Sequence, residues 1–286
     1  MKRQLPELLL EAACLLTLPD GSKRSVISLP DTADIAQRSG RTRKEIDILA
    51  LEHDIVPERY IRNMNALSIK DQITLLQSRV CIVGLGGLGS TVVETLARIG
   101  VGAMTVVDGD VFDESNLNRQ VLSSEQNLSQ TKTATALEKI LTINSSLLIQ
   151  DHTEKMDQEN AARLLEQADL AIDCLDNIHS RFVLEEAAKS AGIPMVSAAV
   201  AGYSGQITTI FPGDKGLKLV YGPQESLTTT RGAETTLGNL AFTVSLLASL
   251  ECAEVIKILL NKNSDLRNHL LIVDLMEHTF ERIRLV

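Results

Sequence analysis

The sequence predicts an α/β fold: a doubly wound, mostly parallel sheet with a C-terminal antiparallel extension and a small N-terminal α+β appendage. Short apolar segments alternate with longer helical ones between residues 80 and 200, which is typical of a parallel sheet covered by helices on both faces. A cluster of glycines follows the first apolar segment and indicates a strand-to-helix turn. After residue 200 the alternation stops, and strands that alternate their faces are expected instead.

The length of the chain agrees with this architecture. With 286 residues and 44% hydrophobic content, the chain fits one large α/β domain with an appendage. We divide it into an N-terminal appendage of unknown role, residues 1–56, and a main domain, residues 57–286.

The appendage is predicted to contain short helices and a β-hairpin. Its expected elements are a helix at 7–14, strands at 15–18 and 25–29, and helices that begin at 31–34 and at 43. Residues 19–22 have the turn chemistry of a hairpin, and Thr42 with Glu45 forms a capping box. Two short helices around Gly40 would also fit a helix-turn-helix. The balance of acidic and basic residues favours a docking or dimerisation unit.

The main domain is predicted to alternate strands and helices. Helices are expected at 68–77, 88–99, 131–144, 158–167, 180–191 and 240–260, and strands at 80–83, 104–108, 148–153, 170–174, 194–200, 206–211, 270–274 and 279–285. Residues 212–237 form a long polar stretch rich in glycine and threonine. Such a stretch is usually either a functional loop or disordered.

Charge and cysteine content exclude several classes of protein. The net charge is −9 and no run of basic residues occurs, so a nucleic-acid partner is not expected. The four cysteines form no C-x-x-C pair, which favours reduced thiols in the cytosol. The apolar segment 8–18 contains Glu11, and the longest one, 240–260, contains Glu251, Glu254 and Lys257. We therefore expect neither a signal peptide nor a membrane span, and predict a cytoplasmic, soluble protein.

The glycine-rich turn predicts a nucleotide site. Gly84, Gly86, Gly87 and Gly89 follow the apolar segment 80–83 and precede a helix. Glycines let backbone N–H groups approach a phosphate closely, and the helix N-terminus favours its negative charge. Asp108 ends the next strand, about 20 residues further on, where a carboxylate can hold ribose hydroxyls.

Further polar residues are expected at the same edge of the sheet. They follow the carboxyl ends of predicted strands or the loops beside them: Asp110, Asn116, Arg119, Gln120, Lys132, Asp176 and Asn177. Arg119 and Lys132 suit a polyphosphate, and Asp176 suits Mg²⁺. Two cations aimed at a phosphate chain fit phosphoryl or adenylyl transfer better than hydride transfer.

Each of these residues also has a simpler structural interpretation. Asp108 could cap a loop, and Lys132 could be a solvated residue in the first turn of a helix. Asp176 and Asn177 could form a turn and a helix cap, and Arg119 could be a surface arginine. The convergence of all of them on one sheet edge favours the site.

Five separated motifs resemble those of a known family. They are Gly84-Leu-Gly-Gly-Leu-Gly89, Asp108-Gly-Asp110, Ser115-Asn-Leu-Asn-Arg-Gln120, Gln130-Thr-Lys132 and Asp173-Cys-Leu-Asp-Asn177. In this order they resemble the activating-enzyme superfamily, which includes ubiquitin-activating enzymes and the bacterial HesA, MoeB and ThiF proteins. The segment Arg59-Tyr-Ile-Arg62 is similar to the family's R-Y-x-R element. The resemblance covers the chain from about residue 56 to its C-terminus, which makes residues 57–286 an ATP-binding adenylation domain.

The resemblance implies an activity. Family members use ATP and Mg²⁺ to adenylate the C-terminal glycine of a ubiquitin-like protein and release pyrophosphate. In bacterial pathways this protein is a sulfur carrier of the MoaD or ThiS kind, ending in Gly-Gly. The family is typically a homodimer in which the arginine that matches Arg62 reaches into the partner's ATP site.

The resemblance also implies roles for individual residues. Gly87 and its neighbours would approach the phosphates, Asp108 would hold the ribose, and Asp176 would bind Mg²⁺. The expected phosphate contacts are Asn116, Arg119, Gln120 and Lys132. The residues expected to carry catalysis are Arg62, Arg119, Lys132 and Asp176.

Two departures from the family pattern refine the prediction. Many relatives hold a structural zinc with two C-x-x-C pairs, but residues 211–221 and the C-terminal segment contain no cysteine, so zinc is not expected. Relatives with a thioester or persulfide step often use a cysteine in the loop that crosses over the carrier's tail. Here the corresponding residues 222–237 contain threonines and no cysteine. Adenylation without a thioester is therefore predicted.

Three other interpretations stay open. A nicotinamide-dependent oxidoreductase would use the same glycine turn, although the motifs supply no catalytic proton donor. A nucleotide-binding scaffold would bind ATP without pyrophosphate exchange, although Arg62, Arg119, Lys132 and Asp176 are all present. Adenylation of a tRNA base or a peptide would keep the chemistry and change the acceptor.

Overall fold

An eight-stranded sheet forms the body of the molecule. The computed structural model describes residues 5–224 and 232–286. The strand order is β11-β10-β9-β8-β7-β4-β5-β6. The parallel strands are β4 (Arg79–Val83), β5 (Ala103–Val107), β6 (Leu148–His152), β7 (Leu170–Asp173) and β8 (Met195–Ala201). The antiparallel extension consists of β9 (Ser204–Ile210), β10 (His269–Asp274) and β11 (Thr279–Arg284). This confirms the predicted doubly wound, Rossmann-like fold.

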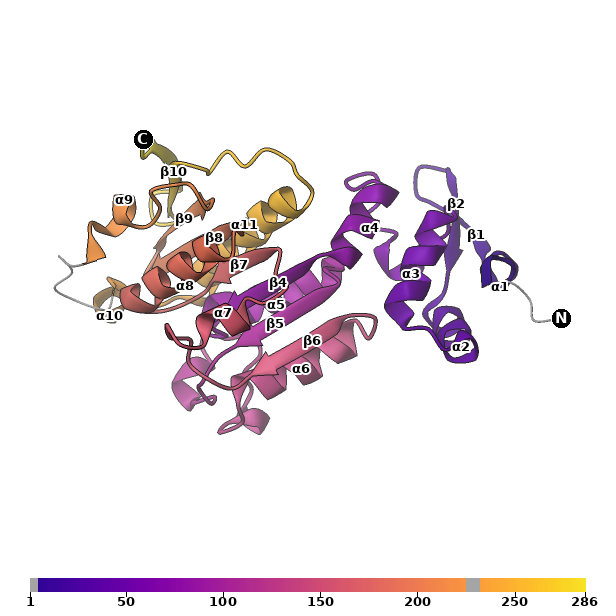
Figure 1. The fold of residues 1–286 in the computed structure, drawn as a ribbon, viewed down its shortest axis with the longest axis horizontal. Helices are drawn as coiled ribbons and strands as arrows, with labels where there is room; N and C mark the ends of the chain where they lie inside the picture. Colours follow the sequence, from indigo (N-terminus) through magenta and orange to yellow (C-terminus); the bar gives the residue numbers. More distant parts are fainter. Residues whose placement is uncertain (1–4, 225–231) are drawn as a thin grey trace.

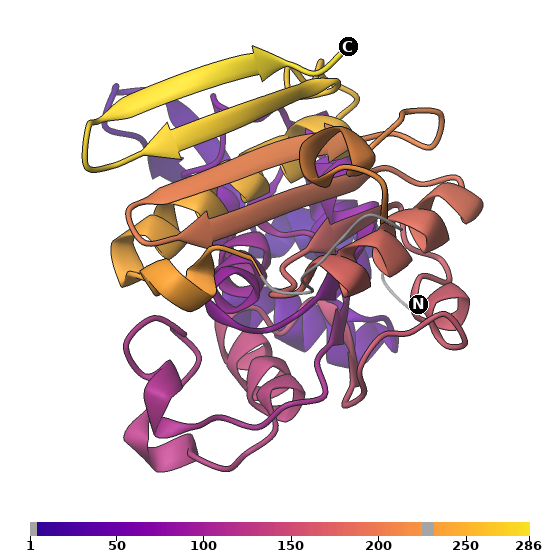
Figure 2. The ribbon, with the colours of Figure 1, turned by 90° about the vertical axis from the view of Figure 1, so that its left-hand side faces the viewer.

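Helices cover both faces of the sheet (Figures 1 and 2). One face carries α5 (Gly87–Ile99), α6 (Lys132–Ile143) and α11 (Ala241–Leu259) over a large apolar core. The other face carries α7 (Ala161–Leu164) and α8 (Ile178–Ser190) over a second core. Two short helices, α9 (Lys218–Tyr221) and α10 (Glu234–Leu237), lie in the polar stretch after β9. No helix in the described ranges combines the length and apolar character needed to cross a membrane.

The order of the parallel strands determines where a ligand can bind. The chain passes outward from β4 to β5 and β6, then returns to the other side of β4 to form β7 and β8. The connections after β4 and β7 therefore leave the sheet towards opposite faces, and a crevice opens between them at the carboxyl ends of the strands. The glycine turn lies at this switch point.

The N-terminal appendage has its own three-stranded sheet, in the order β1-β2-β3. Its elements are α1 (Leu5–Ala12), β1 (Cys14–Thr17), β2 (Lys23–Ile27), α2 (Leu29–Ser39), α3 (Arg43–Glu52) and β3 (Val56–Pro57). The hairpin and the Thr42–Glu45 capping box are present as predicted. The predicted boundary after residue 56 falls inside β3, and the division into two domains and the role of the appendage stay predictions.

Apolar packing and polar contacts together fasten the appendage to the main domain. Val26, Leu51 and Val56 share an apolar cluster with Tyr60 and Leu76, the latter in α4 (Ile69–Gln77). Next to this cluster, residues of α3 and of η1 (Glu58–Tyr60) contact the loop that follows α6. This junction contains the buried Asp47 of α3.

Two local predictions were wrong. The helix expected at 158–167 is reduced to the four residues of α7. Asp157 Oδ1 accepts hydrogen bonds from the backbone N–H groups of Glu159 and Asn160, a local turn that competes with helix formation. The cap of α2 is Ser28, whose Oγ accepts from Asp31 N, rather than a residue of 31–34.

Candidate functional site

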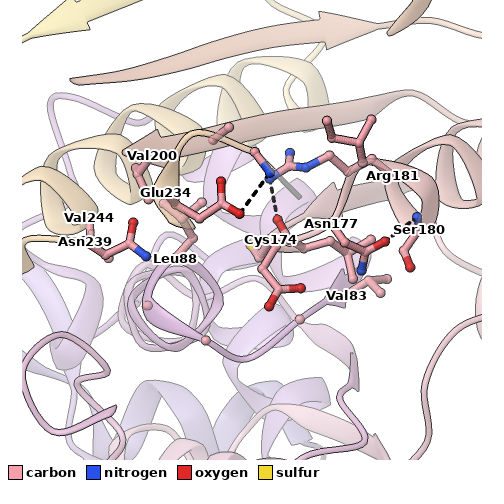
Figure 3. Close-up of a pocket in the computed structure, with 18 of the residues that line it drawn as sticks. Val83, Leu88, Cys174, Asn177, Ser180, Arg181, Val200, Glu234, Asn239 and Val244 are labelled. Atoms are coloured by element: carbon pink, nitrogen blue, oxygen red, sulfur yellow. Dashed lines mark hydrogen bonds between the residues drawn. The ribbon is translucent and has the colours of Figure 1, made fainter. Parts of the chain in front are cut away.

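A cavity of about 820 Å³ lies at the switch point. Its wall contains the ends of β4 and β5 and the loops that follow β6 and β7, and it continues along the sheet over β8, β9 and β10. Figure 3 shows Val83, Cys174 and Asn177 on one side of the cavity and Glu234, Asn239 and Val244 of the α10–α11 region on the other. The wall includes these predicted residues: Gly84, Gly86, Gly87, Asp108, Asp110, Arg119, Gln120, Lys132, Asp176 and Asn177.

The glycine turn is shaped by close backbone packing. Gly84 has a φ of +93°, and a Cβ there would lie 2.6 Å from the carbonyl oxygen of Cys174. A Cβ at Gly89 would lie 1.8 Å from the carbonyl oxygen of Gly84, so the first turn of α5 packs directly on the glycine turn. At Gly86, by contrast, the nearest atom would be Gln120 Nε2 at 3.9 Å. Gly84 and Gly89 thus shape the turn, while the space above Gly86 at the N-terminus of α5 is open to a phosphate.

Asp108 joins the glycine turn to the loop after β5. Its Oδ2 accepts from Leu85 N at 2.6 Å, and its Oδ1 accepts from Asp110 N at 2.8 Å. Lys132 Nζ lies 3.8 Å from Asp108 Oδ2 and 3.4 Å from Asp110 Oδ2. Burial raises the pKa of the Asp108 carboxyl, and the Lys132 ammonium opposes this change. Asp108 therefore has the loop-capping role of the simpler interpretation and also faces the cavity.

The segment after β5 places Arg119 and Gln120 in the wall. Arg119 Nη1 donates to Ser115 O at 3.0 Å and to Asn118 Oδ1 at 2.8 Å, contacts that a phosphate could replace. Gln120 is buried, and its Oε1 has no hydrogen-bond partner among the described residues. Asn116 does not line the cavity; its Oδ1 accepts from Asp113 N at 3.1 Å and shapes the turn.

The loop after β7 presents Asp176 to the cavity. Asp176 is exposed, whereas Asn177 caps α8 by accepting from Ser180 N at 2.8 Å. The helix-cap interpretation of Asn177 is thus confirmed, although the residue also lines the cavity. The described residues contain no cluster of three or more His, Cys, Asp or Glu side chains that could hold a metal ion. Mg²⁺ commonly uses one or two carboxylates, with phosphate oxygens and water as its other ligands, and the exposed Asp176 fits this donor set.

A buried ion pair, which the sequence did not reveal, supports this loop. Asp173 and Arg181 are both buried, with Arg181 Nη1 2.8 Å from Asp173 Oδ2. Arg181 also donates to the carbonyl oxygens of Leu175 and Ala198, and Ser197 Oγ donates to Asp173 Oδ2 at 2.6 Å. The neighbouring Asp173 carboxylate raises the pKa of Arg181 against the effect of burial, so the guanidinium stays charged. The ion pair fixes the backbone immediately before Asp176.

Arg62 lies outside the cavity of its own chain. It is exposed, in the segment between η1 and α4. The ring of the nearby Tyr60 packs against Gly100, at the end of α5 opposite the glycine turn. Because α5 has 13 residues, its two ends are separated by about 20 Å.

One of the chain's four cysteines lines the cavity. Cys174 Sγ donates to Glu251 Oε2 at 3.6 Å, and both residues are buried. Burial and the Glu251 carboxyl raise the pKa of the Cys174 thiol well above its usual range. A thiol in this state is a poor nucleophile.

Sequence reasoning missed two parts of the wall. Glu154, Lys155 and Met156 come from the loop after β6, and their place could have been inferred from the expected carboxyl end of that strand. Gln206 and Ile272 come from β9 and β10, where only the pairing of distant strands brings them to the cavity. Residues 222–237, the segment expected to cross over the carrier's tail, contain several threonines. Three of them, Thr228, Thr229 and Thr230, lie outside the described residues.

Comparison with known proteins identifies relatives over most of the chain. The SAMP-activating enzyme E1 of Haloferax volcanii is 32% identical over 230 residues, 79% of this chain and 84% of that protein. Adenylyltransferase and sulfurtransferase MOCS3 is 30% identical in Danio rerio and 31% in Xenopus laevis, with 100% and 77% of this chain matched. The matches span only 62% and 49% of those two proteins.

Solved structures share the fold. E. coli MccB with ATP superposes with a TM-score of 0.68 at 19% identity, covering 90% of this chain and 79% of that chain. PaaA superposes with a TM-score of 0.65 at 19% identity, covering 80% and 82%. A family model described as the ThiF family matches residues 60–286. The protein therefore belongs to the ThiF family, as its motifs predict.

Proposed function

We propose that the protein is an adenylyltransferase that uses ATP to activate the C-terminal carboxylate of a ubiquitin-like carrier protein. The observation that carries this proposal is the combination of Arg119, Lys132 and Asp176 around a single cavity with the glycine turn. The cavity continues beyond this nucleotide end over β8, β9 and β10, which leaves room for an acyl substrate. Relatives named as an activating enzyme and as adenylyltransferases support the same activity.

The residues of the site match the electrostatic demands of the reaction. Attack of a carboxylate on the α-phosphate brings two anions together and releases pyrophosphate, so charge neutralisation and alignment matter more than a nucleophilic side chain. Lys132 and Arg119 would neutralise phosphate charge, and the open space above Gly86 would admit a phosphate oxygen. Asp108 would hold the ribose with lone pairs that its loop hydrogen bonds leave unused.

Asp176 would hold Mg²⁺ together with phosphate oxygens and water. Bound there, the ion would supply charge neutralisation for the phosphates. Asp110, which also lines the cavity, already faces Lys132 and Lys155 and is better suited to orienting these cations.

The site supports adenylation without a thioester. The raised pKa of Cys174 disfavours thiolate attack on the acyl-adenylate, and the other three cysteines do not line the cavity. We propose that the acyl-adenylate is the product that leaves the site. The acceptor is proposed to be a cytoplasmic sulfur carrier of the MoaD or ThiS kind, ending in Gly-Gly.

We further propose that the active form is a homodimer. The distance of Arg62 from the cavity of its own chain supports the contribution of this arginine to the site of a partner. Mg²⁺ as cofactor, the absence of zinc, and the absence of nucleic-acid and membrane partners belong to the same proposal.

The proposal is tested by ATP–pyrophosphate exchange. Purified protein is incubated with ATP, Mg²⁺, labelled pyrophosphate and carriers of the MoaD or ThiS kind. Exchange should depend on the carrier and should vanish when its terminal glycine is deleted. NAD reduction without exchange would favour an oxidoreductase, and ATP binding without exchange with any carrier would favour a scaffold.

A further inference from the structure

The cavity has two parts of different chemical character. The nucleotide end contains Arg119, Lys132, Lys155, Asp108 and Asp176. The second part, over the antiparallel side of the sheet, is lined by these residues: Ala199, Ala201, Ser204, Gly205, Gln206, Tyr221, Gly232, Ala233, Glu234, Thr235, Asn239 and Ile272. Glu234 is the one formally charged side chain in this set. Arg181 of α8 also lines the cavity beside β8, but its charge is paired with the buried Asp173. A polyphosphate belongs in the first part, and a neutral extended chain belongs in the second.

The floor of the second part is formed by three neighbouring antiparallel strands, β8, β9 and β10. The strand register places Ala199 opposite Gln206 and Gln206 opposite Ile272. The next row contains Ala201, Ser204 and Asp274, and Ser204 Oγ donates to Asp274 Oδ2 at 3.1 Å. Directly opposed residues on neighbouring strands project from the same face of a sheet. Among the residues of these two rows that line the cavity, Gln206 is therefore the one long polar side chain; Asp274 is not part of the wall.

Gln206 is held in place from above the sheet. Its Nε2 donates to the hydroxyl oxygen of Tyr221 at 3.0 Å, and Tyr221 lies in α9 at the cavity wall. Gln206 Oε1 has no partner among the described residues, and the Tyr221 hydroxyl keeps its own proton to donate. The pair thus offers one acceptor and one donor. A peptide unit offers the complementary N–H and C=O groups.

We propose that Gln206, oriented by Tyr221, is a specificity-determining residue that binds the peptide backbone of the acyl substrate's C-terminal tail. This inference rests on the proposed function, because it places the tail in the second part of the cavity. Gln206 would bind the tail whatever its side chains are. The floor of Ala199, Ala201 and Ser204 would then favour tails whose side chains are small. A tail that slid sideways would lose the Gln206 contact and misplace its carboxylate.

The test separates binding of the tail from binding of ATP. Gln206→Leu keeps the size of the side chain and removes its polar atoms. The matched control is Gln150→Leu on β6, an exposed strand position that does not line the cavity. In ATP–pyrophosphate exchange with a MoaD-type carrier, Gln206→Leu should raise the KM for the carrier about tenfold, the loss expected when a buried hydrogen-bond partner is left unpaired. The KM for ATP should stay within about twofold, and Gln150→Leu should match the wild type.

Semisynthetic carriers test whether the contact is to the backbone. The last four residues of the tail are N-methylated one at a time. At one of these positions, N-methylation should raise the KM of the wild-type protein for the carrier about tenfold. The same methylation should add no further loss in Gln206→Leu, because the contact is already absent. Tyr221→Phe should give an intermediate loss, and thermal unfolding should show that each variant is folded.

The outcomes distinguish the two proposals. Two results, each with an active wild type, would overturn the role of Gln206 and leave adenylation intact. One is an unchanged KM for the carrier in Gln206→Leu. The other is a loss in Gln206→Leu that adds to the loss from N-methylation at every position of the tail. No exchange by the wild type with any carrier would overturn the proposed function and this inference with it. A rise in the KM for ATP equal to that for the carrier would indicate a general disturbance of the cavity and would also overturn the assignment.

Discussion

The ammonium nitrogen of Lys132 lies 3.8 Å from Oδ2 of Asp108, and both side chains are only 8% exposed. The lysine thus opposes the rise that burial causes in the pKa of Asp108, and both groups face the cavity. Lys132 connects the ribose end of the proposed ATP site to its phosphate end.

Loss of Lys132 should therefore reduce exchange strongly. Lys132→Met removes a buried cation from the proposed phosphate site, and we expect kcat/KM for ATP to fall by about 10²–10³, the usual effect of losing one preorganised electrostatic contact. Lys139→Met, on the exposed face of the same helix α6, is the matched control and should have wild-type exchange. Equal activity of the two variants would exclude Lys132 from the site.

Asp176 gives a prediction about the metal. Asp176→Asn removes the carboxylate charge and keeps the size of the exposed side chain. We expect exchange at saturating Mg²⁺ to fall at least about 10²-fold, because the phosphate charge would lose its metal-bound neutralisation. Asp151→Asn, on β6 outside the cavity wall, is the control. Undiminished exchange over a full Mg²⁺ titration of Asp176→Asn would contradict the metal assignment.

The position of Arg62 gives a prediction about the proposed homodimer. Arg62→Ala and Asp176→Ala should each be inactive as homodimers. In a two-fold dimer with Arg62 acting in trans, an equal mixture should recover about a quarter of wild-type exchange, since half the dimers are mixed and each has one intact site. The mixture must be prepared by unfolding and refolding or by co-expression. No recovery, with mixed dimers shown by mass spectrometry, would refute action in trans.

Cys174 tests whether a covalent intermediate forms. Cys174→Ala removes the thiol in the cavity wall, and we expect exchange to stay within about threefold of wild type, because the variant loses a small side chain and its weak hydrogen bond to Glu251 but no proposed contact to ATP or Mg²⁺. Mass spectrometry after incubation with ATP and carrier should find no thioester adduct on the wild-type protein. A covalent carrier adduct on the wild type that is absent from Cys174→Ala would overturn the proposal that the reaction stops at the acyl-adenylate without a thioester.

Local sequence motifs predicted which residues of the nucleotide end gather around one cavity, and their roles towards ATP stay predictions. The glycine turn, Asp108 and Asp176 follow the carboxyl ends of parallel strands, which meet at one edge of the sheet, and Lys132 begins the helix after the β5 loop. Arg181 was missed because its partner Asp173 and its carbonyl acceptors belong to three different segments. Gln206 was missed because its place depends on the register between β8, β9 and β10, which no local pattern encodes.

The junction between the appendage and the main domain contains a carboxyl group with a perturbed pKa. Asp47, in α3, is 2% exposed, and its Oδ2 has no partner among the described residues. Burial raises the pKa of Asp47 from 3.8 to about 6, although a hydrogen bond with Ser146 and the charges of Arg59 and Arg43 act in the opposite direction. Arg43 Nη1 also donates to Ser145 Oγ at 2.5 Å, which fastens α3 to the loop after α6.

This raised pKa makes the stability of the protein depend on pH. The folded state binds the proton more tightly than the unfolded chain does, so the stabilisation by protonated Asp47 is complete below about pH 4 and is lost as the pH rises through about 6. Asp47→Asn has no charge to bury, and we expect it to be more stable than wild type at pH 8 by about 1–3 kcal/mol. Near pH 4 the two proteins should unfold at the same denaturant concentration. Urea unfolding at pH 4, 6 and 8 measures the difference, with Glu52→Gln, at an exposed position of α3, as the control. A constant difference between Asp47→Asn and wild type at all three values would show that Asp47 does not titrate in this range.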